Sequence, residues 1–260
     1  MLKISSRKDT ALTVKALYAM KWIYLSPHLD DVALSLGGLV WEQTQAGEQA
    51  AIWTICAGDP PSGVLSPFAE ALHARWGTGE QSMPARRAED ISACRILGAD
   101  YLHFEVPDCI YRRSSLNGEP LYASEEALWW PVHPDEESLV ANLTAQLQTQ
   151  LPDQFHLVCP LTLGNHIDHR LTRTAAERLG IPLKFYADYP YVLQNENRRK
   201  LKNLRSRRYP ISPNGLYAWQ AAVAAHHSQI STFWSGLPEM RVAIQEYQQQ
   251  MDGVMLFSKA

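Results

Sequence analysis

The chain has 260 residues, of which 46% are apolar and 20% charged, a composition typical of soluble globular proteins. Its formal net charge of −3 favours neither nucleic acid nor an acidic membrane surface as a partner. No apolar stretch reaches the length of a membrane span, and Met1–Met20 lacks the compact apolar run of a secretory signal. The four cysteines are scattered without a Cys-x-x-Cys pair, which is typical of buried thiols in a reducing compartment. We therefore expect a cytoplasmic protein.

Short apolar runs alternate with longer helical patterns along most of the chain. The apolar runs predict strands at Trp22–Leu25, Ala50–Cys56, Tyr101–Val106, Phe155–Cys159 and Leu183–Ala187. The helical patterns predict helices at Asp31–Gln45, Pro84–Leu97, Glu136–Leu151 and His166–Leu179. Such alternation predicts an α/β fold with a mostly parallel sheet and helices on both of its faces.

Two long connections interrupt this alternation, at Ala57–Met83 and Pro107–Asp135. Connections of this length inside a compact domain are usually functional lids or disordered segments. We expect them to lie as loop insertions over the carboxyl ends of the strands. The sequence as a whole predicts one domain over residues 1–260, with a core at about 20–190 and a C-terminal part at 191–260.

The C-terminal part begins with a basic run and continues with a helical pattern. Seven of the eleven residues of Arg198–Arg208 are basic, and Ala221–Met251 is helical in pattern with a break at Pro238. Most charge runs are solvated surface, and we interpret this one in the same way. A docking patch for an anionic carrier, a lipid headgroup or a nucleotide is the alternative.

Two clusters of imidazole and carboxylate side chains stand directly after predicted strands. They are His28, Asp30 and Asp31 after the first strand, and His166, Asp168 and His169 after the fourth. Charges near a core cost free energy unless something pairs with them, and a divalent cation would supply that pairing. Because ligands gather at the carboxyl ends of parallel strands, the two clusters predict a single metal site.

Imidazole and carboxylate are suitable ligands for zinc, and catalytic zinc sites typically combine three protein ligands with a water molecule. His28, Asp31 and His169 would form such a set with one open position. Bound zinc lowers the pKa of its water from roughly 15.7 to about 7. Asp30 would take the proton as general base, and a protonated His166 would stabilise the oxyanion that forms on a carbonyl substrate.

Asp168 would orient His166 or His169 through the second ring nitrogen. Each cluster also has a plainer interpretation. Two histidines at helical spacing more often lie on a polar helix face, and Asp30 and Asp31 could simply cap a helix. Their joint occurrence at two predicted strand ends favours the metal site.

The same residues resemble a known family. Ser26-Pro27-His28-Leu29-Asp30-Asp31 resembles the Pro/Ala-His-Pro-Asp-Asp signature of the PIG-L (LmbE-like) zinc-dependent de-N-acetylases. Three further segments are similar to motifs of that family in the same order: Arg86-Arg87-Ala88-Glu89 with Ala93 and Leu97-Gly98, Asn165-His166-Ile167-Asp168-His169, and His226-His227-Ser228-Gln229. The resemblance spans residues 20 to 235. Leu29 and Ile167 stand where the family commonly has proline, and neither change removes a ligand.

The resemblance implies a Rossmann-like fold and hydrolysis of an N-acetyl group, often on a glucosamine-type sugar. Carried over by position, it implies zinc on His28, Asp31 and His169, Asp30 as base and His166 as oxyanion partner. It further implies substrate binding by Arg86, for which Arg87 is a near-equal candidate, and contacts from Asp108 to sugar hydroxyls.

Weaker signals lie outside these motifs. Trp76, Trp129 and Trp130 could stack on a sugar ring or cover an edge of the core, and Tyr111-Arg112-Arg113 could bind an anion or be a solvated loop. His226 could line the site or lie on the surface. Gly37-Gly38 lacks the spacing of a dinucleotide fingerprint, so no nicotinamide cofactor is expected.

The sequence therefore predicts a metal-dependent N-deacetylase with one zinc ion and a small, N-acetylated, sugar-containing substrate. No nucleic acid and no membrane span are expected, and a homo-oligomer is possible. One alternative is a metal-dependent amidase or esterase with a non-sugar substrate. The other is a non-catalytic Rossmann-like binding protein.

Overall fold

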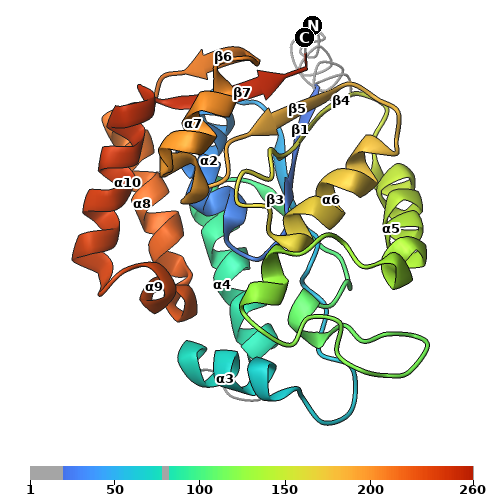
Figure 1. The fold of residues 1–260 in the computed structure, drawn as a ribbon. Coiled ribbons are helices and arrows are strands. Elements are labelled where there is room, and N and C mark those ends of the chain that lie inside the picture. The colour runs from blue at the N-terminus through green and yellow to red at the C-terminus, as the bar shows by residue number, and fades with distance from the viewer. Residues whose placement is uncertain (1–19, 78–81, 260) are drawn as a thin grey trace, which may run out of the picture.

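The computed structural model describes residues 20–77 and 82–259 and is built around a twisted sheet (Figure 1). Most of Met1–Met20 and part of the expected Ala57–Met83 loop lie outside the described residues. The sheet has the strand order β3-β2-β1-β4-β5-β7-β6. Its parallel strands are β1 (Lys21–Ser26), β2 (Ala50–Thr54), β3 (Asp100–His103), β4 (Phe155–Pro160) and β5 (Leu183–Tyr186). The mostly parallel α/β architecture predicted from the alternating pattern is confirmed.

The central strands are apolar throughout because both faces of the sheet are covered. In β1, the residues from Trp22 to Ser26 are all buried, and Tyr24 pairs with Ile52 of β2 and Val158 of β4. A strand that is covered on both faces needs no polar alternation, so it reads as a continuous apolar run. The central strands were found for this reason, whereas β3 lies at the edge of the sheet and is partly exposed.

Helices form a layer on each side of the sheet (Figure 1). One layer holds α2 (Asp31–Gln45), α4 (Ser82–Leu97) and α8 (Pro213–Ala225), which pack against one another. The other holds α5 (Glu137–Gln150) and α6 (Ile167–Glu177), which also pack together. The four helices predicted within residues 31–179 are all present, with ends that differ by no more than two residues.

The first long connection contains a helix that the sequence analysis left as loop. This helix, α3 (Pro67–Trp76), begins at Ser66, whose side chain accepts a hydrogen bond from the Ala69 backbone N–H. Ser followed by Pro is a common helix start, so the signal was present in the sequence. The second connection, residues 107–135, contains short 3₁₀ turns at Cys109–Tyr111, Glu126–Trp129 and Pro134–Glu136.

The C-terminal part, residues 191–260, adds two strands to the main sheet. β7 (Val254–Ser258) runs antiparallel to β5, and β6 (Arg205–Tyr209) forms the sheet edge beyond it. Helices α7 (Asn195–Leu201), α9 (His227–Phe233) and α10 (Leu237–Met251) complete this part. The basic run thus forms most of α7 and a largely exposed edge strand, where charged side chains oppose further strand pairing. No helix within residues 20–77 and 82–259 is long and apolar enough to cross a membrane.

Two glycines of α2 allow α8 to pack closely against it. The fully buried Trp219 of α8 donates its indole N–H to the Ala33 carbonyl at 2.7 Å. A Cβ atom on Gly37 would stand 2.6 Å from the Trp219 ring, and one on Gly38 would stand 2.7 Å from it. The Gly37-Gly38 pair therefore serves helix packing.

Gly37→Ala should destabilise the protein although alanine favours helices more than glycine does. The added methyl group forces the Trp219 ring or the α2–α8 packing to shift, and overpacking of this kind costs about 1–3 kcal/mol. Urea unfolding followed by circular dichroism measures the change. Gln45→Ala, at an exposed position of the same helix, is the control. A Gly37→Ala protein as stable as wild type would contradict the packing argument.

Candidate active site

The two polar clusters meet at the carboxyl edge of the sheet. His28 follows β1, Asp31 begins α2, and His166 immediately precedes α6, which carries His169 in its first turn. Between β1 and β4 the chain order of the strands reverses, because β2 and β3 lie on one side of β1 and β4 and β5 on the other. Ligand sites in open α/β sheets form at such a reversal point. The predicted meeting of the two strand ends is therefore found.

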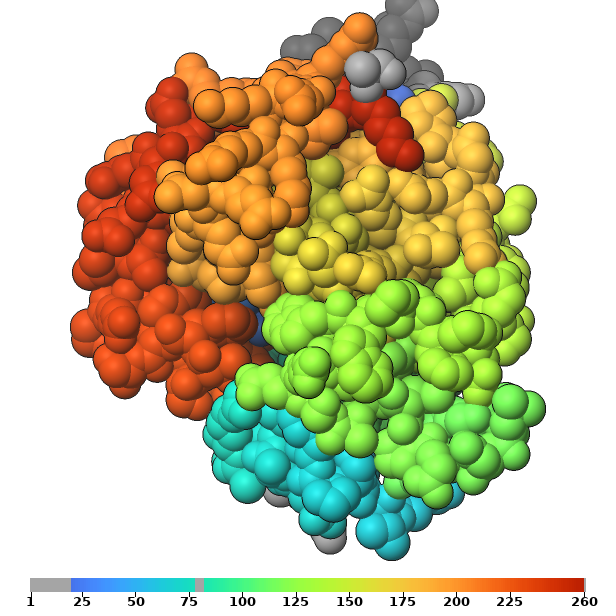
Figure 2. Space-filling model, viewed as in Figure 1, coloured from blue at the N-terminus to red at the C-terminus, as the bar shows by residue number. Residues whose placement is uncertain are grey.

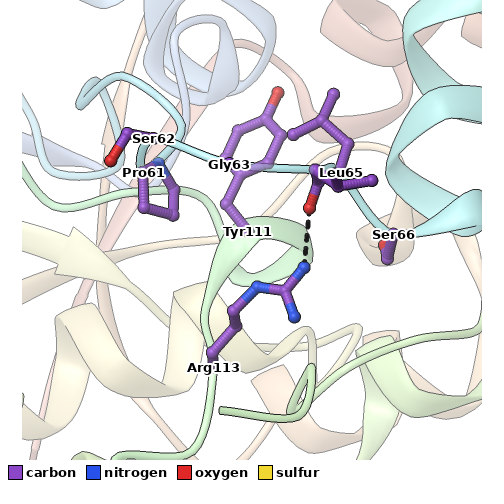
Figure 3. Close-up of a pocket in the computed structure, with 8 residues that line it drawn as sticks. Pro61, Ser62, Gly63, Leu65, Ser66, Tyr111 and Arg113 are labelled. Atoms are coloured by element: carbon purple, nitrogen blue, oxygen red, sulfur yellow. Dashed lines mark hydrogen bonds between the residues drawn. The ribbon is translucent and has the colours of Figure 1, made fainter.

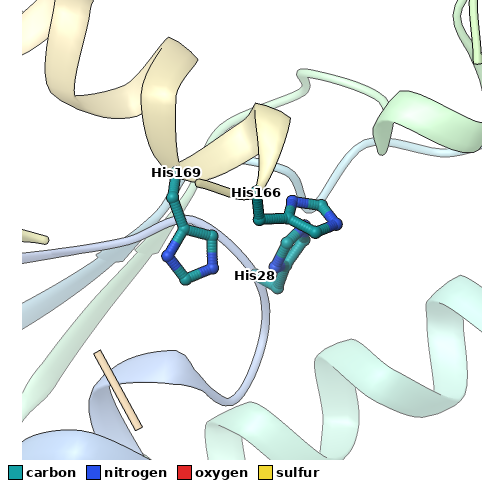
Figure 4. A group of neighbouring side chains, drawn as sticks. All are labelled: His28, His166 and His169. Carbon is teal, nitrogen blue, oxygen red and sulfur yellow. The ribbon is translucent and has the colours of Figure 1, made fainter. Parts of the chain in front are cut away.

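Three histidines form the centre of the cluster (Figure 4). One ring nitrogen from each of His28, His166 and His169 lies within 4.8 Å of the other two. The ring centroids of His28 and His166 are 4.8 Å apart, and His169 stands 5.5 Å from each. Three imidazoles this close can share one cation.

Asp31 connects the two predicted histidine ligands. One carboxylate oxygen lies 3.2 Å from His28 Nδ1, and the other lies 3.3 Å from His169 Nε2. Burial opposes the charge of Asp31, but His169 and His28 outweigh it and hold the pKa of this carboxyl well below its usual range. Asp31 is thus an ionised carboxylate placed between two imidazoles.

Each of these two histidines has an aspartate on its other ring nitrogen. His28 Nε2 lies 3.0 Å from Asp168 Oδ2, and His169 Nδ1 lies 2.6 Å from Asp188 Oδ1. The expectation that the Asp168 side chain orients His166 or His169 was wrong, because its carboxylate faces His28. Asp188 was missed by the sequence analysis, although it follows the fifth predicted strand at the same sheet edge.

Asp30 occupies the N-cap position of α2 without capping the helix. Its side chain makes no hydrogen bond to the first N–H groups of α2. It lines a pocket that also contains His28, His166 and His169, and the residue is 7% exposed. Burial and the neighbouring Asp31 raise the pKa of Asp30, and Arg86 opposes them. The Asp30 carboxylate therefore faces the pocket and takes no part in capping the helix.

His166 is held as a neutral imidazole. Its Nδ1 accepts a hydrogen bond from the Asp168 backbone N–H at 3.2 Å. Burial, together with His28 and His169, lowers the pKa of His166 to about 3. The protonated His166 expected from the sequence is therefore not the form that this site favours. With Nδ1 as acceptor, the single ring proton resides on Nε2, which remains a hydrogen-bond donor.

Arg86 and Arg87 point to different places, which separates the two candidates for substrate binding. Arg86 is buried, lines the pocket and lies over the Trp76 ring at 4.6 Å. Its Nε finds no partner among the described residues. Arg87 donates to the Ala57 carbonyl and to Asp59, outside this pocket. Of the two, Arg86 is the one that lines this pocket.

Aromatic and apolar side chains surround the polar floor of the pocket, whose volume is about 220 Å³. The wall includes Leu72, Trp76, Ile110, Leu128, Trp129, Tyr191 and Phe233. Trp76 and Trp129 thus line the pocket, whereas Trp130 and the buried His226 do not. In the space-filling view the surface is hollowed where the cyan, green and red segments meet (Figure 2).

Asp108 and Glu125 add acidic groups to this pocket. Asp108 Oδ1 accepts a hydrogen bond from the Ile110 backbone N–H at 3.2 Å, while Oδ2 stands 3.9 Å from His28 Nε2. Arg112 is buried and forms an ion pair with Asp168. It is therefore neither part of a solvated loop nor a binding site for an external anion. Its role could not be predicted from the sequence because its partner lies 56 residues away.

The donor atoms fit a zinc ion. His28 and His169 offer imidazole nitrogens on either side of the ionised Asp31, and their outer nitrogens are fixed by carboxylates, as is usual for metal-binding histidines. His28, Asp31 and His169 would hold the ion, and the pocket beside Asp30 leaves room for water and substrate.

Comparisons with known proteins point to one family. Residues 23–180, more than half of the chain, match the PIG-L family model, described as GlcNAc-PI de-N-acetylase. A relative named 2'-N-acetylparomamine deacetylase, from Niallia circulans, is 30% identical over 191 residues, covering 67% of this chain and 68% of the relative.

Solved structures agree in fold. The zinc-inhibited form of teicoplanin deacetylase Orf2 has a TM-score of 0.77 at 25% identity, covering 92% of this chain and 97% of the other. A deacetylase–teicoplanin complex has a TM-score of 0.75 at 24% identity with the same coverage, which shows a shared fold. The chain belongs to the PIG-L family of de-N-acetylases.

Proposed function

We propose that this protein is a zinc-dependent hydrolase that removes an N-acetyl group from an amino-sugar-like substrate. The observation that supports the proposal is the contact of the Asp31 carboxylate with both His28 and His169. The carboxylate of Asp30, which does not cap its helix, lines the same pocket. The relatives are named as deacetylases of acetylparomamine and teicoplanin, which supports a sugar-containing substrate.

Zinc would supply a water molecule whose pKa is lowered towards neutrality. In our proposal Asp30 accepts the proton of this water, and the water oxygen adds to the amide carbonyl carbon. His166 donates from Nε2 to the carbonyl oxygen as negative charge develops on it. Asp30 then returns the proton to the amide nitrogen as the C–N bond breaks, which releases acetate and the free amine.

Other residues of the pocket would bind the substrate. Arg86, whose Nε lacks a protein partner, would donate hydrogen bonds to the substrate, and the free oxygen of Asp108 would accept one from a sugar hydroxyl. Trp76 and Trp129 would cover the ring or an attached apolar group. Asp168 would act on the metal ligand His28.

Acetate release from a panel of N-acetylated sugars, compared with simple esters and non-sugar amides, tests the function. Asp30→Asn should bind one zinc ion per chain while turnover falls by roughly 10²–10⁴-fold, because the amide cannot accept the proton. Metal analysis of the same samples is the control for site integrity. Normal turnover by Asp30→Asn would remove Asp30 from the base role, and faster ester or non-sugar amide hydrolysis would favour the non-sugar alternative.

His169→Ala and His166→Ala should separate metal binding from catalysis. His169→Ala removes an ion ligand and should lose the zinc, whereas His166→Ala should keep it and lose turnover by roughly 10²–10³-fold. Plasma emission spectrometry and acetate release on both proteins measure the two effects. Stoichiometric zinc in His169→Ala would contradict the ligand set.

The pH profile should report the raised pKa of Asp30. Asp30 must be ionised to accept a proton, so kcat/KM should fall as the pH is lowered through its pKa. This acid limb should lie above the value of about 3.9 that is typical of an exposed aspartate. Zinc content is measured at each pH so that metal loss is not mistaken for titration. Full kcat/KM retained down to pH 4 would exclude a base with a raised pKa.

A further inference from the structure

A buried chain of charged side chains connects the long 107–136 segment to His28. Arg112 donates from Nη1 to Asp168 Oδ1 and from Nε to Glu136 Oε1. The other oxygen of Asp168 lies 3.0 Å from His28 Nε2, and the other oxygen of Glu136 accepts from the Tyr122 hydroxyl at 2.6 Å. The order of contacts is therefore Tyr122–Glu136–Arg112–Asp168–His28.

These groups are almost completely shielded from water. Asp168 is 0% exposed, Glu136 is 3% exposed and Arg112 is 5% exposed. A buried carboxylate keeps its charge only when a cation or hydrogen-bond donors compensate it. For Asp168 this compensation comes from the Arg112 guanidinium and from the Cys109 backbone N–H.

The orientation of Asp168 matters because it selects the ring nitrogen with which His28 faces the ion. Asp168 Oδ2 also accepts a hydrogen bond from the Cys109 backbone N–H at 3.1 Å. With zinc bound, Asp168 would keep the ring proton on Nε2, and Nδ1, 3.2 Å from Asp31, would offer its electron pair to the ion.

The other histidine ligand is supported differently. Asp188 accepts from His169 and from the Leu163 backbone N–H at 3.2 Å. Within residues 20–77 and 82–259, neither lysine nor arginine forms an ion pair with Asp188. Among the described residues, an arginine therefore contacts the aspartate that supports His28, but none pairs with the aspartate that supports His169.

We propose that Arg112 is a positioning residue, which fixes the metal ligand His28 through Asp168 and thereby sets the affinity of the site for zinc. The inference rests on the proposed zinc site and assigns Arg112 no contact with substrate. The planar fork of arginine serves two carboxylates at once, which the single ammonium group of lysine reproduces only in part. Glu136 and Tyr122 hold the far side of the fork.

The plainer alternative is a buried ion pair that stabilises the fold and nothing else. Breaking such a pair destabilises a protein, but it has no reason to change zinc affinity through Asp168. A double-mutant cycle separates the two, because residues that act through one another give non-additive effects.

The zinc dissociation constant tests the proposal. It is measured on the full-length, metal-stripped protein by competition with a chromophoric chelator. Arg112→Met should weaken zinc binding by roughly 10–100-fold, the usual effect of losing support for a metal ligand, and Arg112→Lys should weaken it less. Asp168→Asn should show a similar loss. The double variant Arg112→Met/Asp168→Asn should bind no more weakly than the weaker single variant.

Arg113 is the matched control. It follows Arg112 directly, lies in an outer pocket and donates to the backbone carbonyls of Val64 and Gly118 (Figure 3). Arg113→Met should therefore bind zinc as wild type does. Circular dichroism and thermal unfolding of each metal-free protein report the fold. If Arg112→Met does not fold, Glu136→Gln and Tyr122→Phe loosen the same guanidinium and should weaken zinc binding several-fold.

Three results would overturn the inference. Zinc binding by folded Arg112→Met equal to wild type would remove Arg112 from the ligand's support. Fully additive losses in the cycle would show that Arg112 does not act through Asp168. A wild-type protein without zinc binding would overturn the zinc site itself, and with it the proposed function.

Discussion

Buried negative charge at the carboxyl edge of the sheet is the constraint on which the rest of this structure depends. Asp30, Asp31, Asp108, Asp168 and Asp188 are all buried there, within a few residues of the ends of β1, β3, β4 and β5. Such a concentration of carboxylates is stable only with nearby cations and donors. The histidines and Arg112 supply part of this compensation, and a divalent cation between His28 and His169 would supply more.

Two kinds of element form this site, the parallel strands and the long connections between them. Parallel strands bring distant segments to one edge, so that a cluster from residues 28–31 meets one from residues 166–169. The long connections then close over that edge and carry Trp76, Trp129 and the Arg112–Glu136 pair. The connection at 107–136 has no long helix of its own, and buried ion pairs and a small apolar cluster fix it instead.

Close packing of aromatic rings against glycines occurs at the pocket and between the helices. Gly164 lies where a Cβ atom would stand 2.4 Å from the Tyr191 ring, so glycine lets that ring close over the pocket beside His169. On the opposite layer, Gly37 and Gly38 admit Trp219. In both places the absence of a side chain on glycine allows an aromatic ring to approach the backbone closely. Of these rings, that of Tyr191 lines the pocket.

The sequence by itself determined the α/β class, the central strands and the two polar clusters, because buried strands, amphipathic helices and strand-end ligands follow local patterns. It did not indicate β6, since a charged edge strand lacks the apolar run of a central strand. β7 has such a run in Val254–Phe257, which the sequence analysis left unassigned. Only the tertiary structure showed that Asp188 contacts His169 and that Asp168 faces His28. It also showed that Arg86, and not Arg87, lines the pocket. Arg112 is buried against Asp168, which the sequence did not indicate. These contacts join residues up to 140 positions apart, and their geometry depends on strand order and burial, which no local pattern encodes.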